Sequence, residues 1–246
     1  MCVYTVRLIL FGLGEINMTR SKLLAAVFAL PLMIAGAGSA QANILALNID
    51  GSTSISSANF NLQKQGYINA LTSLLNTDGS NTVGVWQFAS TVQQVFVLTT
   101  INSAAAKTAL LTAIGAMTQL TGNTAIGQSI LDARTAINAF VGPGNRIIDV
   151  STDGTNTTGV LPGPATVTAN GSGITVNCLG VGGSADCSWN GTGLDFVASS
   201  AATFETALRQ KLTIELTKTP EPMTLTLFGT GLAGAAFMRR RRAKKA

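Results

Sequence analysis

Histidine is absent from all 246 residues of this sequence. It is the commonest zinc ligand in proteins and the general base of Ser-His-Asp triads and Cys-His dyads. Its absence therefore excludes the common zinc sites and both of these nucleophilic mechanisms. Cysteine is nearly absent as well, with three residues in the chain. What remains for a functional site is mainly the chemistry of oxygen atoms.

Basic residues are scarce in the middle of the chain, although the formal net charge is +5. Nine of the sixteen lysines and arginines lie in the first 22 and the last eight residues. The stretch between these ends then carries seven basic and ten acidic residues, or about −3. A nucleic-acid-binding surface needs a positive patch, so this class of function is excluded.

Two of the three cysteines lie in the body of the chain. Cys2 falls within the expected targeting segment, which leaves Cys178 and Cys187. The nine-residue separation between them contains three glycines, so the loop is able to close. In an exported protein we expect a disulfide between Cys178 and Cys187, and two free buried thiols are the alternative.

The N-terminal region has the three parts of a secretory signal peptide. A positive start at Arg20 and Lys22 is followed by an apolar run and then by small residues that end at Ala42. We expect residues 1–42 to be removed, with Met18 as an alternative start of translation and Asn43 as the first mature residue. An N-terminal membrane anchor is disfavoured because the apolar run is short for a span of about 20 residues.

The C-terminus has a Pro-Glu-Pro motif at Pro220, Glu221 and Pro222, then an apolar stretch, then four arginines at 239–242. This order closely resembles the PEP-CTERM sorting signal of Gram-negative bacteria. The resemblance implies a tail of residues 218–246 that is anchored transiently through a short transmembrane segment at 223–238. It also implies processing by an exosortase as a partner. An ordinary single-pass tail anchor is the alternative.

Between the two ends, strand-like and helix-like segments alternate. Expected strands cover residues 44–49, 82–88, 92–98, 146–150 and 173–181, and expected helices cover 57–75, 102–117, 125–140 and 203–216. The alternation predicts a doubly wound α/β fold with a mostly parallel sheet and helices on both faces. In such sheets, ligands bind at the carboxyl ends of the strands, near the point where the strand order switches.

An acid and two hydroxyls stand at alternate positions directly after the first expected strand. They are Asp50, Ser52 and Ser54. Hard divalent cations such as Mg²⁺ and Ca²⁺ prefer oxygen ligands of this kind. The alternative is an ordinary strand-to-helix turn in which the acid or a serine caps the next helix.

Two later residues are expected at the same edge of the sheet. Asp153 follows the strand at 146–150, and Thr124 lies in the loop that enters the helix at 125–140. The carboxyl ends of parallel strands meet at one edge, so these side chains would approach Asp50. Taken singly, Asp153 is an ordinary turn signal and Thr124 a helix cap.

Asp-Gly-Ser-x-Ser, a distant Thr and a later Thr-Asp-Gly, in this order, resemble the metal-ion-dependent adhesion site of von Willebrand factor A domains. Residues 124–127, 146–151 and 173–177 are also similar to a bacterial A-like family of undefined function. The resemblance implies a von Willebrand A-like (Rossmann-like) domain over residues 43–217. One departure is Asn-Thr-Ala at 123–125, where many A domains have Gly-Thr-x-Thr; the Thr itself is kept.

The resemblance also implies the role of each metal-site residue. Ser52 and Ser54 would coordinate the metal directly, and Asp50 and Asp153 directly or through water. Thr124 would join them in the ligand-bound state. Mg²⁺ is the expected cation, with Mn²⁺ or Ca²⁺ as alternatives.

We therefore expect an exported, non-enzymatic binding protein at the surface or in the matrix of a Gram-negative bacterium. Its partner, a protein or matrix ligand, would offer an acidic group to the metal. One alternative is a structural component of an exopolysaccharide or biofilm matrix, in which the metal is incidental. A metal-assisted hydrolase is disfavoured because no His, Lys or further acid stands near the motifs as a general base. Trp189, in a glycine-rich loop, is a further candidate for ligand contact.

Overall fold

The structure is a computed structural model that describes residues 43–217. In chain order its elements are β1 (Asn43–Asp50), α2 (Ser57–Leu74), β2 (Asn81–Phe88), β3 (Val92–Thr100), α3 (Ala104–Gly115), α4 (Ile126–Ala139), β4 (Arg146–Thr152), α5 (Pro162–Asn170), β5 (Ile174–Val181), β6 (Asp195–Ala198), a 3₁₀ turn η1 (Ala201–Thr203) and α6 (Phe204–Leu216).

The six strands form one sheet in the order β3-β2-β1-β4-β5-β6. All neighbouring pairs are parallel except β2 and β3, which form an antiparallel hairpin at one edge. The chain leaves β1 for β2 on one side and later returns to β4 on the other, so the strand order switches between β1 and β4. The predicted doubly wound, mostly parallel sheet is confirmed.

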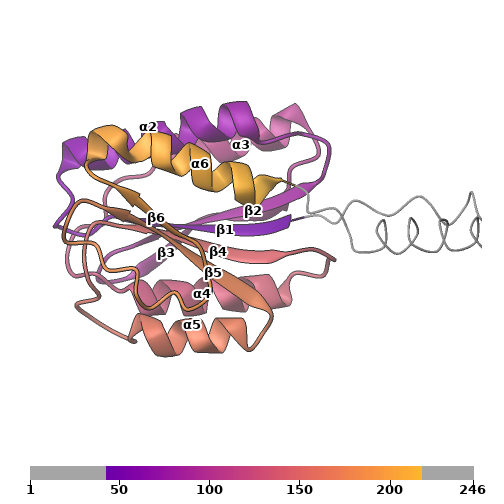
Figure 1. Cartoon of the computed structure of the whole chain (residues 1–246). Coiled ribbons are helices and arrows are strands. Elements are labelled where there is room, and N and C mark those ends of the chain that lie inside the picture. Colours follow the sequence, from indigo (N-terminus) through magenta and orange to yellow (C-terminus); the bar gives the residue numbers. More distant parts are fainter. Residues whose placement is uncertain (1–42, 218–246) are drawn as a thin grey trace, which may run out of the picture. The chain divides into compact units, whose positions relative to one another are not determined.

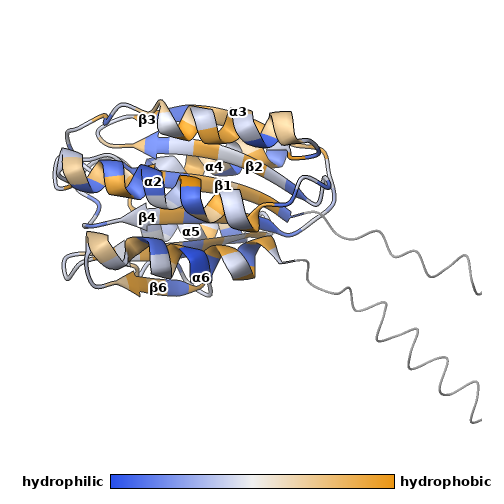
Figure 2. Ribbon diagram, turned by 90° about the horizontal axis from the view of Figure 1, so that it is seen from above, coloured by the Kyte–Doolittle hydropathy of each residue, from blue (hydrophilic) through white to orange (hydrophobic). Residues whose placement is uncertain are grey.

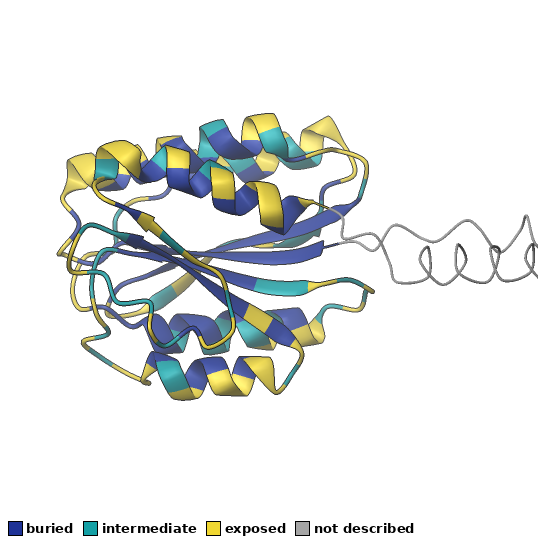
Figure 3. Cartoon of the chain, in the orientation of Figure 1, coloured by how far each residue is buried: buried dark blue, intermediate teal, exposed yellow. Residues whose placement is uncertain are grey.

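Helices cover both faces of the sheet, with α2, α3 and α6 on one side and α4 and α5 on the other (Figure 1). Alternate residues of β1 face the two layers, as the pleat of a strand requires. Leu45 and Leu47 belong to the core under α2, α3 and α6, whereas Ile44 and Ala46 belong to the core over α4 and α5. The central strands thus contribute apolar side chains to both layers and are almost wholly buried (Figure 3).

Local signals explain most of the element boundaries. Ser56 and Ser103 are the N-caps of α2 and α3, and each side-chain oxygen accepts a hydrogen bond from the backbone N–H three residues later. The outward faces of α2 and α6 carry many hydrophilic residues, as expected for helices with one face in water (Figure 2).

Two elements were not among the expected ones. α5 contains Pro162, Pro164 and three β-branched residues, a composition poor in helix formers. It forms because Pro162 occupies the start of the helix, where proline is favoured, and because Ala165 and Ala169 pack into the core over α4 and α5. β6 has only four residues, too few to show a period.

Cys178 on β5 and Cys187 in the following loop form a disulfide. Cys178 is fully buried, and Gly180 on the same strand lies against the loop through Ala185 and Cys187. The bond holds the loop between β5 and β6 against the sheet.

We predict that Cys187→Ser lowers the free energy of unfolding by about 2–3 kcal/mol, because a bond closing a short loop restricts the unfolded chain. Chemical denaturation of oxidised protein measures the effect. Wild-type protein reduced with dithiothreitol is the matched control and should lose a similar amount. Equal stability of all three samples would show that the bond does not contribute.

Candidate metal centre

The loop after β1 is folded around the carboxylate of Asp50. The backbone N–H of Ser52 donates to Asp50 Oδ1 at 2.8 Å, and the N–H of Gly51 donates to the carbonyl of Phe88 on β2 at 2.8 Å. The next helix is capped by Ser56, whose side chain accepts from the N–H of Asn59. Asp50 and the two serines are therefore not the helix cap, and that alternative is wrong.

The end of β4 completes a hydrogen-bonded network with this loop. The Thr152 hydroxyl donates to Asp50 Oδ2 at 2.6 Å. The Ser54 hydroxyl donates to Asp153 Oδ1 at 2.7 Å, and the hydroxyl oxygens of Ser52 and Ser54 lie 3.0 Å apart. The structure thus brings four of the five predicted residues together at the carboxyl ends of β1 and β4.

The loop before α4 is joined to the Asp50 loop through its backbone. Gly122 N–H donates to Thr53 Oγ1 at 2.6 Å, and Thr53 N–H donates to the Gly122 carbonyl at 3.0 Å. Thr121 adopts a left-handed backbone with φ of 57°, which is rare for a β-branched residue, and its N–H donates to the Gly51 carbonyl at 2.9 Å. Strained backbone of this kind is held in place by surrounding contacts and is frequent at functional sites.

Thr124 follows this strained turn and is almost fully buried. Its N–H donates to Thr157 Oγ1 at 2.8 Å, and its carbonyl accepts from Thr157 N–H at 2.9 Å. The N-cap of α4 is Ala125, so Thr124 is not the cap that its position suggested. Among residues 43–217, no group hydrogen-bonds to the Thr124 hydroxyl, which leaves that oxygen able to act as a ligand.

The site is negatively charged. Asp50 is fully buried, and within the described part of the chain no lysine or arginine forms an ion pair with Asp50 or Asp153. Burial raises the pKa of Asp50 to about 6, against the lowering effect of the Thr152 and Ser52 hydrogen bonds, and the nearby Asp153 charge raises it further. A buried carboxylate without a counter-charge is costly, and a cation would relieve that cost.

The donor set suits a hard divalent cation. It consists of two carboxylates and three hydroxyls, the oxygen ligands that such ions prefer. Among residues 43–217, no group of three or more His, Cys, Asp or Glu side chains is placed to hold a metal ion, so the hydroxyls would have to supply most of the protein ligands. Three of the five donor residues, Asp50, Ser52 and Thr124, are at most 5% exposed, whereas Ser54 is exposed and Asp153 is half-buried.

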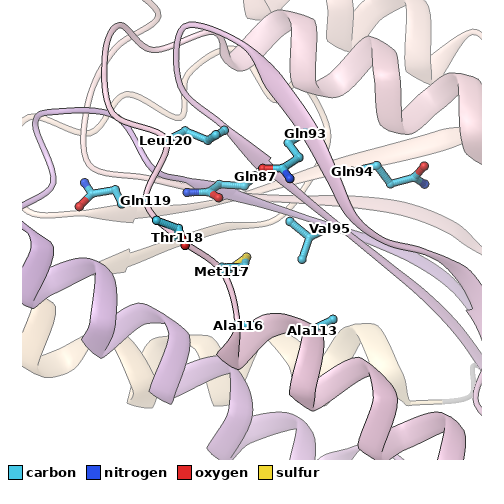
Figure 4. A pocket seen from close by; sticks show the side chains of 10 residues that line it. All are labelled: Gln87, Gln93, Gln94, Val95, Ala113, Ala116, Met117, Thr118, Gln119 and Leu120. Carbon is cyan, nitrogen blue, oxygen red and sulfur yellow. The ribbon is translucent and has the colours of Figure 1, made fainter.

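Gln119 is a supporting residue that no sequence pattern singled out. Its side-chain amide donates to the carbonyls of Ser52 at 3.1 Å and Ile55 at 2.7 Å and so fixes the loop from behind. It also lines a pocket of about 450 Å³ between β2, β3 and the end of α3 (Figure 4). The buried Gln87 amide lines the same pocket, beside Gly51.

Trp189 does not present a free ring to solvent. It is half-buried against the core over α4 and α5, and its indole N–H donates to the carbonyl of Asp186. It is therefore mainly a packing residue of the loop between β5 and β6. Pro220, Glu221, Pro222 and the apolar stretch 223–238 lie outside the described residues. Within residues 43–217, no helix has the length and apolar character needed to cross a membrane.

Comparison with protein families gives two matches. Residues 41–220 match the model of a family described as "Protein of unknown function (DUF1194)". Residues 218–242 match the PEP-CTERM protein-sorting motif. No curated protein shows significant similarity to the chain.

Several solved structures have a similar fold. Proximal thread matrix protein 1 from the mussel byssus, in a form described as having a zinc-occupied MIDAS motif, is 24% identical with a TM-score of 0.60, covering 72% of this chain and 48% of that one. A von Willebrand factor type A protein from Catenulispora acidiphila is 16% identical with a TM-score of 0.61, covering 72% and 43%. BatB from Bacteroides thetaiotaomicron is 20% identical with a TM-score of 0.55, covering 70% and 98%. This chain thus spans about half the length of the mussel protein, and at these identities the likeness shows the fold alone.

We predict that Asp50→Asn stabilises the metal-free protein at neutral pH. The folded-state pKa of Asp50, about 6, lies above the unfolded value of 3.8, so the folded wild type binds the extra proton. Its free energy of unfolding should therefore fall, by up to about 3 kcal/mol, as the pH rises from 4 through 6. Asparagine avoids this loss because its carbonyl still accepts from Ser52 N–H, while the Thr152 hydroxyl can accept from its amide.

Urea denaturation in EDTA at pH 4.5 and 7.5 measures this effect. The stability difference between Asp50→Asn and wild type should increase in favour of the variant at the higher pH. A difference that does not change with pH would contradict the assignment of a buried, uncompensated charge at Asp50.

Proposed function

The chain belongs to the DUF1194 family and carries a PEP-CTERM sorting motif, and on this premise we propose that it is an exported adhesion-type protein that binds its partner through a divalent cation. Asp50, Ser52, Ser54 and Asp153 would hold the cation, Thr124 would join them when the partner is bound, and Mg²⁺ fits their oxygen-only chemistry. The observation that carries the proposal is the buried carboxylate of Asp50, which lies beside hydroxyls and a second carboxylate and forms no ion pair with a lysine or arginine of residues 43–217.

The hydrogen bonds of the site suggest which role each residue would have in binding the metal. The Ser52 and Ser54 hydroxyls lie next to both carboxylates and would turn their lone pairs to the metal once their protons are redirected. Asp50 and Asp153 would supply the compensating charge. The bound cation would supply a Lewis-acidic position that an acidic group of the partner completes. Two protein carboxylates only neutralise the charge of a divalent ion. The loaded site would then carry no net negative charge that repels an acidic group of the partner.

The termini support an exported location. Cleavage after Ala42 would make Asn43 the first residue, and β1 begins at Asn43, so removal of residues 1–42 would leave the central strand whole. Exosortase processing at the sorting motif would then act beyond α6, which ends at Leu216. We propose a final location at the cell surface or in the extracellular matrix.

We propose that the site binds rather than catalyses. A hydrolase would need a general base close to a metal-bound water. Among the residues that the structure describes, the titratable side chains in the network are Asp50 and Asp153, both assigned to the metal. An activity screen in which Asp153→Ala removes a Mg²⁺-dependent hydrolysis would contradict this assignment.

Isothermal titration calorimetry with Mg²⁺ or Mn²⁺ should show one binding event per chain. Asp153→Ala and Asp50→Asn should each weaken it more than tenfold, or by at least about 1.4 kcal/mol, because each removes one of two charged ligands. Asp132→Asn is the matched control: it removes an acid on α4 that accepts from Gln128 at 2.8 Å, and it should bind like the wild type. Absence of binding in the wild type would overturn the proposal.

Thr124→Ala separates metal binding from partner binding. Thr124 would join the coordination only when the partner is bound, so the variant should keep Mg²⁺ affinity within about twofold while losing partner capture. Capture is measured by pull-down from the producing organism's matrix with Mg²⁺ and with EDTA. Capture by the wild type that survives EDTA would favour a structural matrix role without metal-dependent binding. Capture by Thr124→Ala equal to that by the wild type would contradict the role of Thr124.

A further inference from the structure

A second cluster of ionisable side chains lies inside the domain, between β4 and α6. Lys211 and Glu215 stand four residues apart on α6 and share one face of the helix, while Asp149 points to them from β4. The side chains of Lys211 and Asp149 are 0% exposed and that of Glu215 is 1% exposed. Lys211 Nζ contacts Asp149 Oδ1 directly and lies 3.9 Å from Glu215 Oε1.

The surroundings of this cluster are neutral. Asn177 on β5 donates to Glu215 Oε1 at 2.7 Å, and Tyr67 on α2 bonds to Ser151 on β4 at 2.6 Å. Within residues 43–217, Asp149 Oδ2 and Glu215 Oε2 are buried without a hydrogen-bond partner. Two carboxyl groups therefore share one ammonium group at a buried position whose other described neighbours are neutral, which is a costly arrangement.

We propose that Lys211 and Asp149 are joined by an intramolecular isopeptide bond, formed by the folded chain itself with Glu215 as the proton carrier. The three chemical roles required for this reaction are present in contact with one another: an amine, a carboxyl carbon to accept it, and a second carboxyl group to move protons. This inference concerns the fold and does not rest on the metal site.

The reaction is a condensation without any change in oxidation state. Lys211 first passes a proton to Asp149, which gives a neutral amine and a carboxylic acid. The Nζ lone pair then attacks Asp149 Cγ, while the Glu215 carboxyl proton stabilises the carbonyl oxygen. Glu215 next relays a proton from nitrogen to the departing hydroxyl. The C–O bond breaks, one water molecule leaves, and Glu215 ends protonated, as it began.

The setting favours each of these steps. Contact between Nζ and the Asp149 carboxyl group replaces a bimolecular encounter, so folding meets the entropic cost of bringing the amine and the carboxyl group together. Burial raises the pKa of Glu215 well above its usual range, and the neighbouring Asp149 carboxylate raises it further, so Glu215 holds the proton that the mechanism needs. A dry interior also disfavours the reverse reaction, which consumes water.

The product would remove the features that make the ion cluster unfavourable. An amide replaces one buried ammonium and one buried carboxylate, and the reaction removes one of the two Asp149 oxygens, of which Oδ2 has no partner. The bond would join residues 62 positions apart and tie α6, the last described element before the sorting motif, to a central strand. Force applied through the C-terminal tail would then pass to β4 covalently.

Peptide mass mapping of the full chain, purified from the producing cells, tests the proposal. Trypsin should release residues 147–209 still linked to residues 210–218, uncleaved after Lys211 and lighter than the two peptides together by one water molecule. Recovery of unlinked peptide 147–209, with cleavage after Lys211, would overturn the proposal.

Three variants test the chemistry. Asp149→Asn should lose ammonia instead of water and reach the same final mass as the cross-linked wild type, because both reactions give the same amide. Lys211→Arg should show no link. Glu215→Gln keeps a hydrogen-bonding side chain but cannot relay the proton, so at least tenfold slower linking is expected. A link that forms as fast in Glu215→Gln would overturn the role of Glu215.

Discussion

The constraint that shapes the candidate site is the burial of the Asp50 carboxylate at the point where the strand order of the sheet switches. A parallel sheet with this topology sends its chain in opposite directions from β1 and β4, so their carboxyl ends border one crevice. Asp50 lies at that border, where its carboxylate accepts hydrogen bonds from Ser52 N–H and the Thr152 hydroxyl. No lysine or arginine of residues 43–217 forms an ion pair with it. Burial raises its pKa to about 6, so the metal-free site is a source of instability that a divalent ion would remove.

Local patterns predicted the part of the site that lies close in sequence. Asp50, Ser52 and Ser54 were recognisable because they stand at alternate positions in a tight loop directly after an apolar strand, and Asp153 because it follows a second buried strand. Gln119 was not recognisable, since a glutamine in a loop has no pattern that shows which carbonyls it will bind. α5 and β6 were missed because one is rich in proline and β-branched residues and the other has only four residues.

The α6 cluster shows a different limit of sequence reasoning. Lysine and glutamate four residues apart on an amphipathic helix normally form a solvated surface pair. Here both are buried, because α6 packs in the layer with α2 and the pair faces Asp149 and Asn177 of the sheet. The candidate metal ligand Asp153 thus follows β4 directly, and the cross-link candidate Asp149 lies within β4. One strand therefore connects the ligand-facing edge to the helix that leads to the sorting motif.

The central claim, that this fold places a divalent cation between the ends of β1 and β4, is tested most directly by crystallography with manganese. Crystals of the mature domain grown with Mn²⁺ and measured near the manganese absorption edge would locate the ion by its anomalous signal. The account predicts one peak within bonding distance of the Ser52 and Ser54 hydroxyls, bordered by Asp50 and Asp153. No peak at this position in crystals that contain Mn²⁺, or a peak only elsewhere on the domain, would contradict it.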